Sequence, residues 1–275
     1  MTGSRPLVVS TRDADAGDEL TSALERHGFD VWRVPAIVIE PAPDSGALDA
    51  TLADAGIDWI VFTSPRAVEI VCARRSWIDQ WPRIRQRARV AAVGPGTAAR
   101  LRAHDVPVAA VAEGAGDSLP DALRAHGSSI EGLQVLWPRG NRARTGWRDA
   151  LERLGAHVVS PVAYLTRLAP VAAVAPLVDA VRAGRVAAVT FLSPSSAEGV
   201  ARACADGTLR ELAGAAVVAA IGGTTATRLA ELGAPPEVVA PEPTPDALAA
   251  ALAAFVFDRV RTVRGRGADA PPLRS

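Results

Sequence analysis

The chain is 275 residues long and carries 30 acidic and 30 basic side chains, so its formal net charge is zero. Because a neutral chain has no global field that attracts polyanions, neither nucleic acid nor a membrane surface is expected as a partner. All the basic residues are arginine. The absence of lysine excludes Schiff-base, pyridoxal-phosphate and Walker-type phosphate-loop chemistry, each of which needs a lysine amine.

The remaining composition indicates a two-domain protein of the reducing cytoplasm. The two cysteines and four histidines lack the spacing of a metal site or a disulfide framework, so no metal is expected. No apolar leader precedes Leu7, and the charge-free stretch 212–227 is shorter than the roughly 20 apolar residues that span a bilayer. With 49% hydrophobic residues the chain can bury a large core, and its length suits two domains.

Short apolar runs alternate with helical patterns along the chain. Helical spacing, as at Leu20 and Leu24, and C-terminal glycines such as Gly233 predict helices between the runs. Continuous apolar strands that alternate with helices are typical of parallel sheets covered on both faces, so we expect a doubly wound α/β class. The predicted strands are 7–10, 31–34, 59–62, 90–93, 106–110, 133–137, 158–159, 186–191, 216–221 and 238–240.

Two segments, 34–43 and 160–170, break this rhythm. Each has prolines at its ends and a β-prone middle, around Ile37 in one and Tyr164 in the other. They are either loops within two consecutive domains or crossover strands by which the chain passes between domains, and periodicity leaves both open. Beyond Phe257 the apolar pattern gives way to arginine, glycine and proline, which predicts a disordered basic tail rather than an interaction arm.

An internal repeat organises the chain. The pattern LERxG at 24–28 recurs at 151–155, FxSP at 62–65 recurs at 191–194, and GxxTA at 94–98 recurs at 222–226, at offsets of 127, 129 and 128. The first of these offsets also relates Arg12 to Arg139. A nearly constant offset over separate motifs indicates a tandem duplication, with halves near 1–130 and 131–257.

The repeated motifs fall at predicted strand ends, where ligands of doubly wound sheets bind. Ser64 and Ser193 each precede a proline as N-caps, and the glycine turns before Thr97 and Thr225 are expected to bring a hydroxyl to the helix cap. Unpaired N–H groups and the helix dipole attract carboxylates or phosphates there. Any one of these motifs is an ordinary helix start. However, the motifs recur in two symmetric sets, which favours anion-accepting loops that face one cleft. Arg12 and Arg139, at strand ends, can also bind a carboxylate bidentately.

Six strings in unbroken order carry a family resemblance: VFTSPRAVE (61–69), VAAVGPGTAARL (90–101), LERLGAHVVSPVAYLT (151–166), TFLSPSSAEGV (190–200), AAIGGTTATRLAELG (219–233) and PTPDALAAAL (243–252). Through them the chain resembles the uroporphyrinogen-III synthase family over residues 5–256. The resemblance implies two flavodoxin-like domains joined by a two-stranded linker ladder around Ile37 and Tyr164. One domain combines 1–36 with 166–257, the other is 40–161, and 258–275 is the tail.

The resemblance also implies a function. It is that of a monomeric lyase without a cofactor, which cyclises hydroxymethylbilane to uroporphyrinogen III with loss of water and inversion of ring D in tetrapyrrole biosynthesis. The substrate is polyanionic, and a transient contact with the preceding bilane-forming enzyme is expected. The rival interpretations are a binding or sensor module that captures an anionic small molecule without turnover, and a sugar-phosphate or nucleotide-binding α/β protein.

The resemblance carries over to individual residues. Tyr164, the only tyrosine, is implied as the catalytic residue that hydrogen-bonds the departing hydroxyl; alternatively it packs between linker strands and shapes the cleft. Gly223 stands where the family more often has proline, which loosens the turn before Thr224. The implied substrate-binding residues are Ser64, Ser193, Thr97, Thr224, Thr225, Arg12, Arg66 and Arg139.

Overall fold

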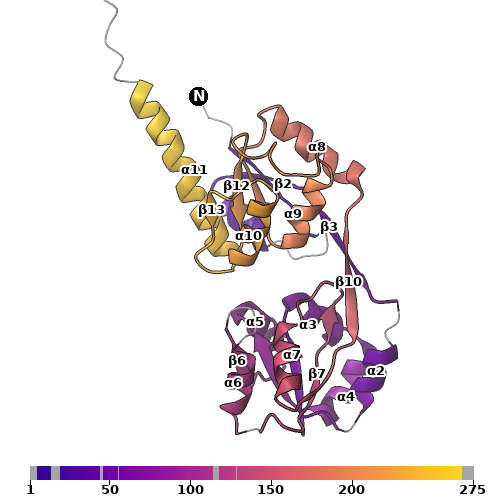
Figure 1. Cartoon of the computed structure of the whole chain (residues 1–275). Helices are drawn as coiled ribbons and strands as arrows, with labels where there is room; N and C mark the ends of the chain where they lie inside the picture. Colours follow the sequence, from indigo (N-terminus) through magenta and orange to yellow (C-terminus); the bar gives the residue numbers. More distant parts are fainter. Residues whose placement is uncertain are drawn as a thin grey trace, which may run out of the picture. The chain divides into compact units, whose positions relative to one another are not determined.

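The computed structural model describes residues 5–13, 19–43, 46–54, 56–113, 118–127 and 129–267, with side chains described as far as Arg259. The chain divides into two compact units (Figure 1). Unit 1 combines Met1–Val38 with Arg167–Ser275, and unit 2 is the continuous segment Ile39–Thr166. In the described part of the chain no helix combines the length and the hydropathy of a membrane span.

Unit 1 contains a five-stranded parallel sheet in the order β13-β12-β11-β1-β2. If the strands are numbered in chain order within the unit, they lie in the order 2-1-3-4-5, which is the flavodoxin-like arrangement. The central strands are wholly apolar or nearly so and are buried. The strands are β1 (Leu7–Ser10), β2 (Asp30–Arg33), β11 (Ala188–Phe191), β12 (Val217–Ala220) and β13 (Val238–Val239).

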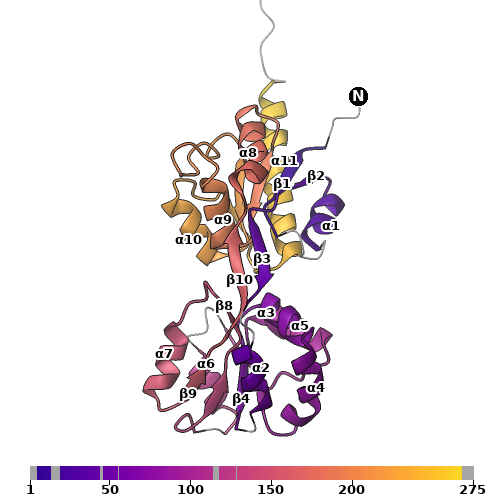
Figure 2. The ribbon, with the colours of Figure 1, turned by 90° about the vertical axis from the view of Figure 1, so that its right-hand side faces the viewer.

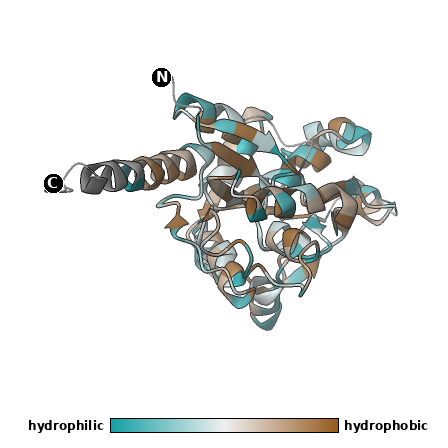
Figure 3. Cartoon of the chain, turned by 90° about the horizontal axis from the view of Figure 1, so that it is seen from above, coloured by the Kyte–Doolittle hydropathy of each residue, from teal (hydrophilic) through white to brown (hydrophobic). Residues whose placement is uncertain are grey.

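Helices cover both faces of the unit 1 sheet. On one face Leu20 and Leu24 of α1 (Glu19–Arg26) and Leu248 of α11 (Pro245–Gly267) form a core cluster with Val8. The other face is covered by α8 (Val171–Arg182), α9 (Pro194–Ala201) and α10 (Gly223–Glu231). Figure 3 shows hydrophobic and hydrophilic residues mixed along the helices. In α1, for example, Leu20 and Leu24 are buried whereas Glu25 and Arg26 are exposed, so this helix has one face for the core and one for water.

Unit 2 repeats this architecture with the strand order β6-β5-β4-β7-β9. One face of its sheet carries α2 (Gly46–Ala53), α3 (Pro65–Cys72), α4 (Arg75–Ile84) and α5 (Pro95–Ala103), and the other carries α6 (Leu119–Arg124) and α7 (Gly146–Arg153). The strands are β4 (Trp59–Phe62), β5 (Arg89–Val93), β6 (Ala110–Ala112), β7 (Gln134–Leu136) and β9 (His157–Val159).

The two sequence repeats do not correspond to the two units. Strands β1 and β2 have their repeat partners in β7 and β9, whereas β4, β5 and β6 have theirs in β11, β12 and β13. Each five-stranded sheet therefore takes two strands from one repeat and three from the other. The expected fold class, α/β with two flavodoxin-like units, is confirmed, and the segments 34–43 and 160–170 contain strands.

The third sheet differs from the expected two-stranded ladder. Its order is β3-β10-β8, where β3 is Ile37–Pro41, β10 is Val162–Leu168 and β8 is Arg139–Gly140. Figure 2 shows β3 and β10 side by side. The additional strand β8 pairs in parallel with β10. An arginine and a glycine after a proline have no β propensity, so the sequence pattern could not reveal it.

Two further expectations are corrected. The predicted strand 106–110 is wrong, because β6 is Ala110–Ala112. Val106 instead packs in the core cluster without a ladder partner, at the end of a turn in which Asp105 has a φ of 56°. The disordered basic tail was expected over 258–275, but residues 258–267 are helical because α11 runs through to Gly267, and residues 268–275 lie outside the described residues.

One close backbone contact fixes the point where the chain leaves unit 1. A Cβ at Gly199, in the middle of α9, would lie 2.1 Å from the carbonyl oxygen of Ala36. That oxygen accepts a hydrogen bond from the backbone N–H of Ala169 at 3.0 Å, where the chain re-enters the unit. Glycine disfavours a helix interior by about 1 kcal/mol relative to alanine, so its presence here reflects the space that this approach requires.

Isolated segments test the interleaved architecture. Residues 39–166 contain every strand of the unit 2 sheet and both of its helix layers. We expect this segment to fold alone, with a single cooperative urea transition and a near-UV circular dichroism signal. Residues 131–257 contain one complete sequence repeat but only parts of both sheets, so we expect them not to fold cooperatively. Cooperative folding of 131–257 would contradict the interleaving.

The substitution Gly199→Ala tests the contact with Ala36. Overpacking against a backbone carbonyl outweighs the gain in helix propensity, so we expect the free energy of unfolding to fall by roughly 1–3 kcal/mol. Gly146→Ala is the matched control, because Gly146 is also helical and nothing lies within 4 Å of its added Cβ. Urea denaturation of both variants measures the difference, and equal stabilities would show that the contact carries no constraint.

Candidate functional site

A serine and the only tyrosine meet at the carboxyl end of a central strand of unit 2. Ser64 lies between β4 and α3 and is the N-cap of that helix, with φ −154° and ψ 145°; its Oγ accepts a hydrogen bond from the N–H of Ala67 at 3.1 Å. The same Oγ lies 3.1 Å from the phenol oxygen of Tyr164 in β10. A hydroxyl that accepts from a fixed backbone N–H can donate its own proton to the phenol oxygen, which stabilises negative charge there.

The backbone around Tyr164 is held by its neighbours in unit 2. The N–H of Asn141 donates to the Tyr164 carbonyl at 3.1 Å, and the N–H of Thr166 donates to the Asn141 side-chain oxygen at 2.8 Å. Tyr164 is half-buried and packs against the core cluster that includes Ala163. The ring is therefore placed by both its strand and its packing.

The equivalent cap in unit 1 has no phenol. Ser193 begins α9 with a capping box, in which its Oγ accepts from the N–H of Ser196 at 3.1 Å and the Ser196 hydroxyl lies 3.3 Å from the N–H of Ser193. The position that corresponds to Tyr164 in the other repeat, at the offset of 127, is the buried Ile37. The two units thus share a helix-capping hydroxyl, but the pair of hydroxyls occurs in unit 2.

The helices that follow the two glycine turns have N-caps that differ from the prediction. The N-caps of α5 and α10 are Gly94 and Gly222, with no side-chain hydrogen bond, so the expected hydroxyl caps are wrong. Gly94 has a φ of 80°, a conformation that favours glycine. Thr97 and Thr225 stand at the third helical positions and are only 3% exposed, whereas Thr224 is exposed. Thr224 is therefore the threonine of this set that has surface to offer a ligand.

The predicted arginines have different surroundings. Arg66 donates to Glu69 at 2.8 Å, and Glu69 also lies 3.5 Å from Arg100. Arg139 donates to the carbonyl oxygens of Ser160 and Gly140 at 3.3 and 3.2 Å, so its guanidinium group is engaged with backbone. It is thus not a symmetric counterpart of Arg12.

Arg12 lies two residues beyond the end of β1 and is close to one carboxylate. Its Nη1 is 4.0 Å from Glu19, beyond hydrogen-bond distance. This Nη1 is buried and has no hydrogen-bond partner in the described part of the chain. A guanidinium nitrogen in that state is suited to receive a carboxylate oxygen.

The thiols are unsuited to nucleophilic chemistry at neutral pH. Burial raises the pKa of Cys72 to about 12 and that of Cys204 to about 11, so both stay protonated. Both cysteines are free and buried. Within the described ranges, no three His, Cys, Asp or Glu side chains are grouped so that they could hold a metal ion.

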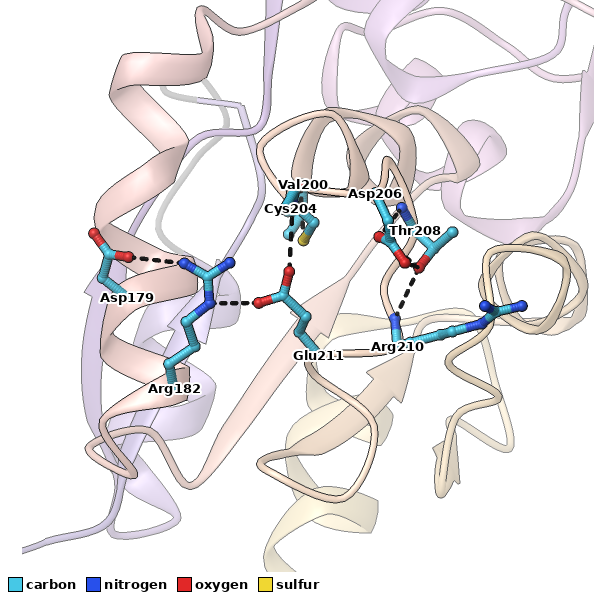
Figure 4. Close-up of polar contacts among 9 residues, drawn as sticks. Asp179, Arg182, Val200, Cys204, Asp206, Thr208, Arg210 and Glu211 are labelled. Carbon is cyan, nitrogen blue, oxygen red and sulfur yellow. Dashed lines mark hydrogen bonds and ion pairs between the residues drawn. The ribbon is translucent and has the colours of Figure 1, made fainter.

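A polar network that the sequence did not reveal ties the connection before β12 to α8 (Figure 4). Arg182 of α8 pairs with Glu211 and with Asp179, and Glu211 also accepts from the N–H of Ala205. The Arg182 hydrogen bond lowers the pKa of Glu211, and hydrogen bonds from Thr208 lower the pKa of Asp206. All the acidic groups in this network are satisfied within it, so the network is a structural clamp rather than a ligand site.

The fold and the site define a class: α/β proteins of two flavodoxin-like units with hydroxyl and guanidinium groups at strand ends. The chain belongs to the uroporphyrinogen-III synthase family, since the family's sequence profile, described as uroporphyrinogen-III synthase HemD, matches residues 18–250. A Methanothermobacter thermautotrophicus protein with a provisional assignment as a uroporphyrinogen-III synthase is 32% identical over 228 residues, which cover 81% of this chain and 88% of that protein.

Solved structures support the same fold. A mutant uroporphyrinogen III synthase from the extremely thermophilic bacterium Thermus thermophilus matches with a TM-score of 0.62 and 18% identity, over 94% of this chain and 99% of that one. The uroporphyrinogen-III synthetase from Helicobacter pylori matches with a TM-score of 0.54 and 16% identity, over 94% and 99% of the two chains. At these identities the likeness concerns the fold, and the family assignment rests on the sequence matches.

Proposed function

We propose that the chain is a lyase that cyclises hydroxymethylbilane to uroporphyrinogen III, with loss of water and inversion of ring D. Membership of the uroporphyrinogen-III synthase family supports the reaction class. The main structural support for the proposal is the 3.1 Å hydrogen bond between the hydroxyl groups of Ser64 and Tyr164 at the start of α3. No cofactor or metal enters this chemistry.

The first step requires a proton donor. Tyr164 gives its phenol proton to the hydroxymethyl oxygen, the C–O bond breaks, and water leaves an azafulvene on the bilane. The Ser64 hydroxyl, itself held by the N–H of Ala67, donates to the resulting phenolate. Ring D attacks the protonated azafulvene through its substituted α-carbon to give a spiro intermediate. The bond from that carbon to the methylene bridge of ring C then breaks, ring D turns, and the methylene joins the other, free α-carbon of ring D. The proton that this carbon loses returns to the phenolate.

The substrate carries an acetate and a propionate on every pyrrole, so binding needs several local anion sites. The helix N-terminus of α3 and the exposed Thr224 offer N–H and hydroxyl donors, and Arg12 offers a guanidinium nitrogen without a hydrogen bond. The remaining proposed substrate-binding residues are Ser193, Thr97, Thr225, Arg66 and Arg139.

Because the bilane also closes without an enzyme to the uninverted isomer, the protein must impose the conformation that favours inversion. Fixed donors on rigid strand ends suit this task, since they hold the carboxylates while the ring that reacts stays free to turn. An anion-binding module would need the same donors but no proton source. The Tyr164–Ser64 pair therefore favours turnover over binding alone.

Incubation with fresh hydroxymethylbilane tests the proposed function. We expect the type III isomer as the main product, measured by chromatographic separation of the oxidised type I and type III porphyrins. A no-protein incubation and heat-denatured protein give the spontaneous background. Type I product alone, at the spontaneous rate, would contradict the proposed function.

The substitution Tyr164→Phe removes the phenol and keeps the ring. A general acid typically contributes 10²-fold or more, so we expect kcat for type III product to fall by roughly 10²-fold, with little change in KM or melting temperature. The matched control is Phe255→Tyr, which adds a phenol far along the sequence on α11. Unchanged turnover in Tyr164→Phe would reduce Tyr164 to a packing residue.

A further inference from the structure

The space beside Tyr164 exists because residue 140 has no side chain. We propose that Gly140 is a positioning residue. Because it has no side chain, the Tyr164 ring can pack against its backbone, and this places the phenol oxygen within hydrogen-bond distance of Ser64. This inference rests on the proposed function of Tyr164 for its catalytic consequence. The placement itself is a separate, measurable property of the folded chain.

The contact is short and involves the hydroxyl end of the ring. A Cβ built at Gly140 would lie 2.7 Å from Cζ, 2.8 Å from Cε2 and 2.9 Å from the phenol oxygen of Tyr164. All three separations are shorter than van der Waals contact. The φ of Gly140 lies outside the range from +20° to +160° that favours glycine, so its backbone conformation is open to alanine. The requirement for glycine therefore comes from the tyrosine and not from the local backbone.

Strand pairing explains why these two residues compete for one space. Tyr164 and Gly140 are direct partners in the parallel pairing of β10 with β8, and the register shifts between Val162 and Tyr164. Side chains of partner residues on adjacent strands lie on the same face a few ångströms apart. Beside glycine, an aromatic ring can fold across the neighbouring strand, which brings its far end towards the start of α3.

The strands themselves have little freedom to yield. Asn141, next to Gly140, donates its N–H to the Tyr164 carbonyl at 3.1 Å, and Arg139 donates its N–H to the Pro161 carbonyl at 3.1 Å. Gly140 is buried. An added methyl group will therefore displace the end of the Tyr164 side chain, which can rotate, rather than separate the strands. Displacement by about an ångström is enough to break the 3.1 Å contact with Ser64.

The single tyrosine makes the placement directly observable. Tyrosine-labelled full-length protein has one set of tyrosine ring resonances, all from Tyr164. We expect Gly140→Ala and Ser64→Ala each to shift these resonances. Gly146→Ala, the matched control in the same unit with nothing near its added Cβ, should leave them unchanged. Ring resonances that Gly140→Ala does not move would overturn the proposal, whatever the activity.

Turnover provides the second measurement. We expect Gly140→Ala to lower kcat for type III product on the order of 10²-fold, as misplacement of a catalytic group does, with little change in KM. In the Tyr164→Phe background the same substitution should cause no further loss, because the phenol it displaces is already absent. A further loss of similar size in that background would show that Gly140 acts independently of Tyr164, against the proposal.

A stability cycle covers the case in which Gly140→Ala does not fold. In the double variant Gly140→Ala with Tyr164→Ala the opposing ring is gone, so we expect the melting temperature of Tyr164→Ala alone to be retained. A double variant that remains unfolded would overturn the proposal. If the tyrosine resonances shift as expected while Tyr164→Phe keeps full turnover, the positioning stands and the proposed role of the phenol in the reaction fails.

Discussion

The two crossings of the chain between the units are the constraint on which the rest depends. Because the chain leaves unit 1 after β2 and returns through β10, each sheet is assembled from both sequence repeats. The site in unit 2 follows from this. Ser64 belongs to the first repeat, whereas Gly140 and Tyr164 belong to the second. Neither repeat alone contains both hydroxyls, so the pair exists only in the interleaved fold.

The charge composition acquires a meaning once the donors are located. A chain of zero net charge without lysine binds a polyanion only through local sites. For the substrate that we propose, backbone N–H groups at helix starts, such as the start of α3 after Ser64, would supply such sites without adding charge. Most guanidinium groups near the strand ends are already neutralised or engaged, as Arg66 is by Glu69 and Arg139 by backbone carbonyls. Local geometry therefore matters more here than the number of arginines.

Sequence patterns predicted the parts of the fold that burial determines. Strands such as 59–62 are buried at every residue, so an apolar run marks their ends closely. The Ser64 cap was predictable because a serine before a proline is an efficient helix start. The glycine caps and strand β8 were not, since they arise from backbone conformation and tertiary pairing. The importance of Gly140 was hidden for the same reason: a missing side chain leaves no signal in a hydrophobic pattern.

The two repeats differ at their linker strands, and the chemistry that we propose depends on this difference. Both repeats retain a serine cap after the equivalent strand, Ser64 in one and Ser193 in the other, because capping serves the fold. The linker strands differ, with Ile37 buried as core and Tyr164 half-buried beside a hydroxyl. A phenol at position 37 would have to bury its oxygen, at a cost of roughly 1–3 kcal/mol if no partner were supplied. Tyr164 avoids that cost because Gly140 leaves room for its ring and Ser64 provides the partner, so its phenol is available for the role that we propose while Ile37 stays in the core.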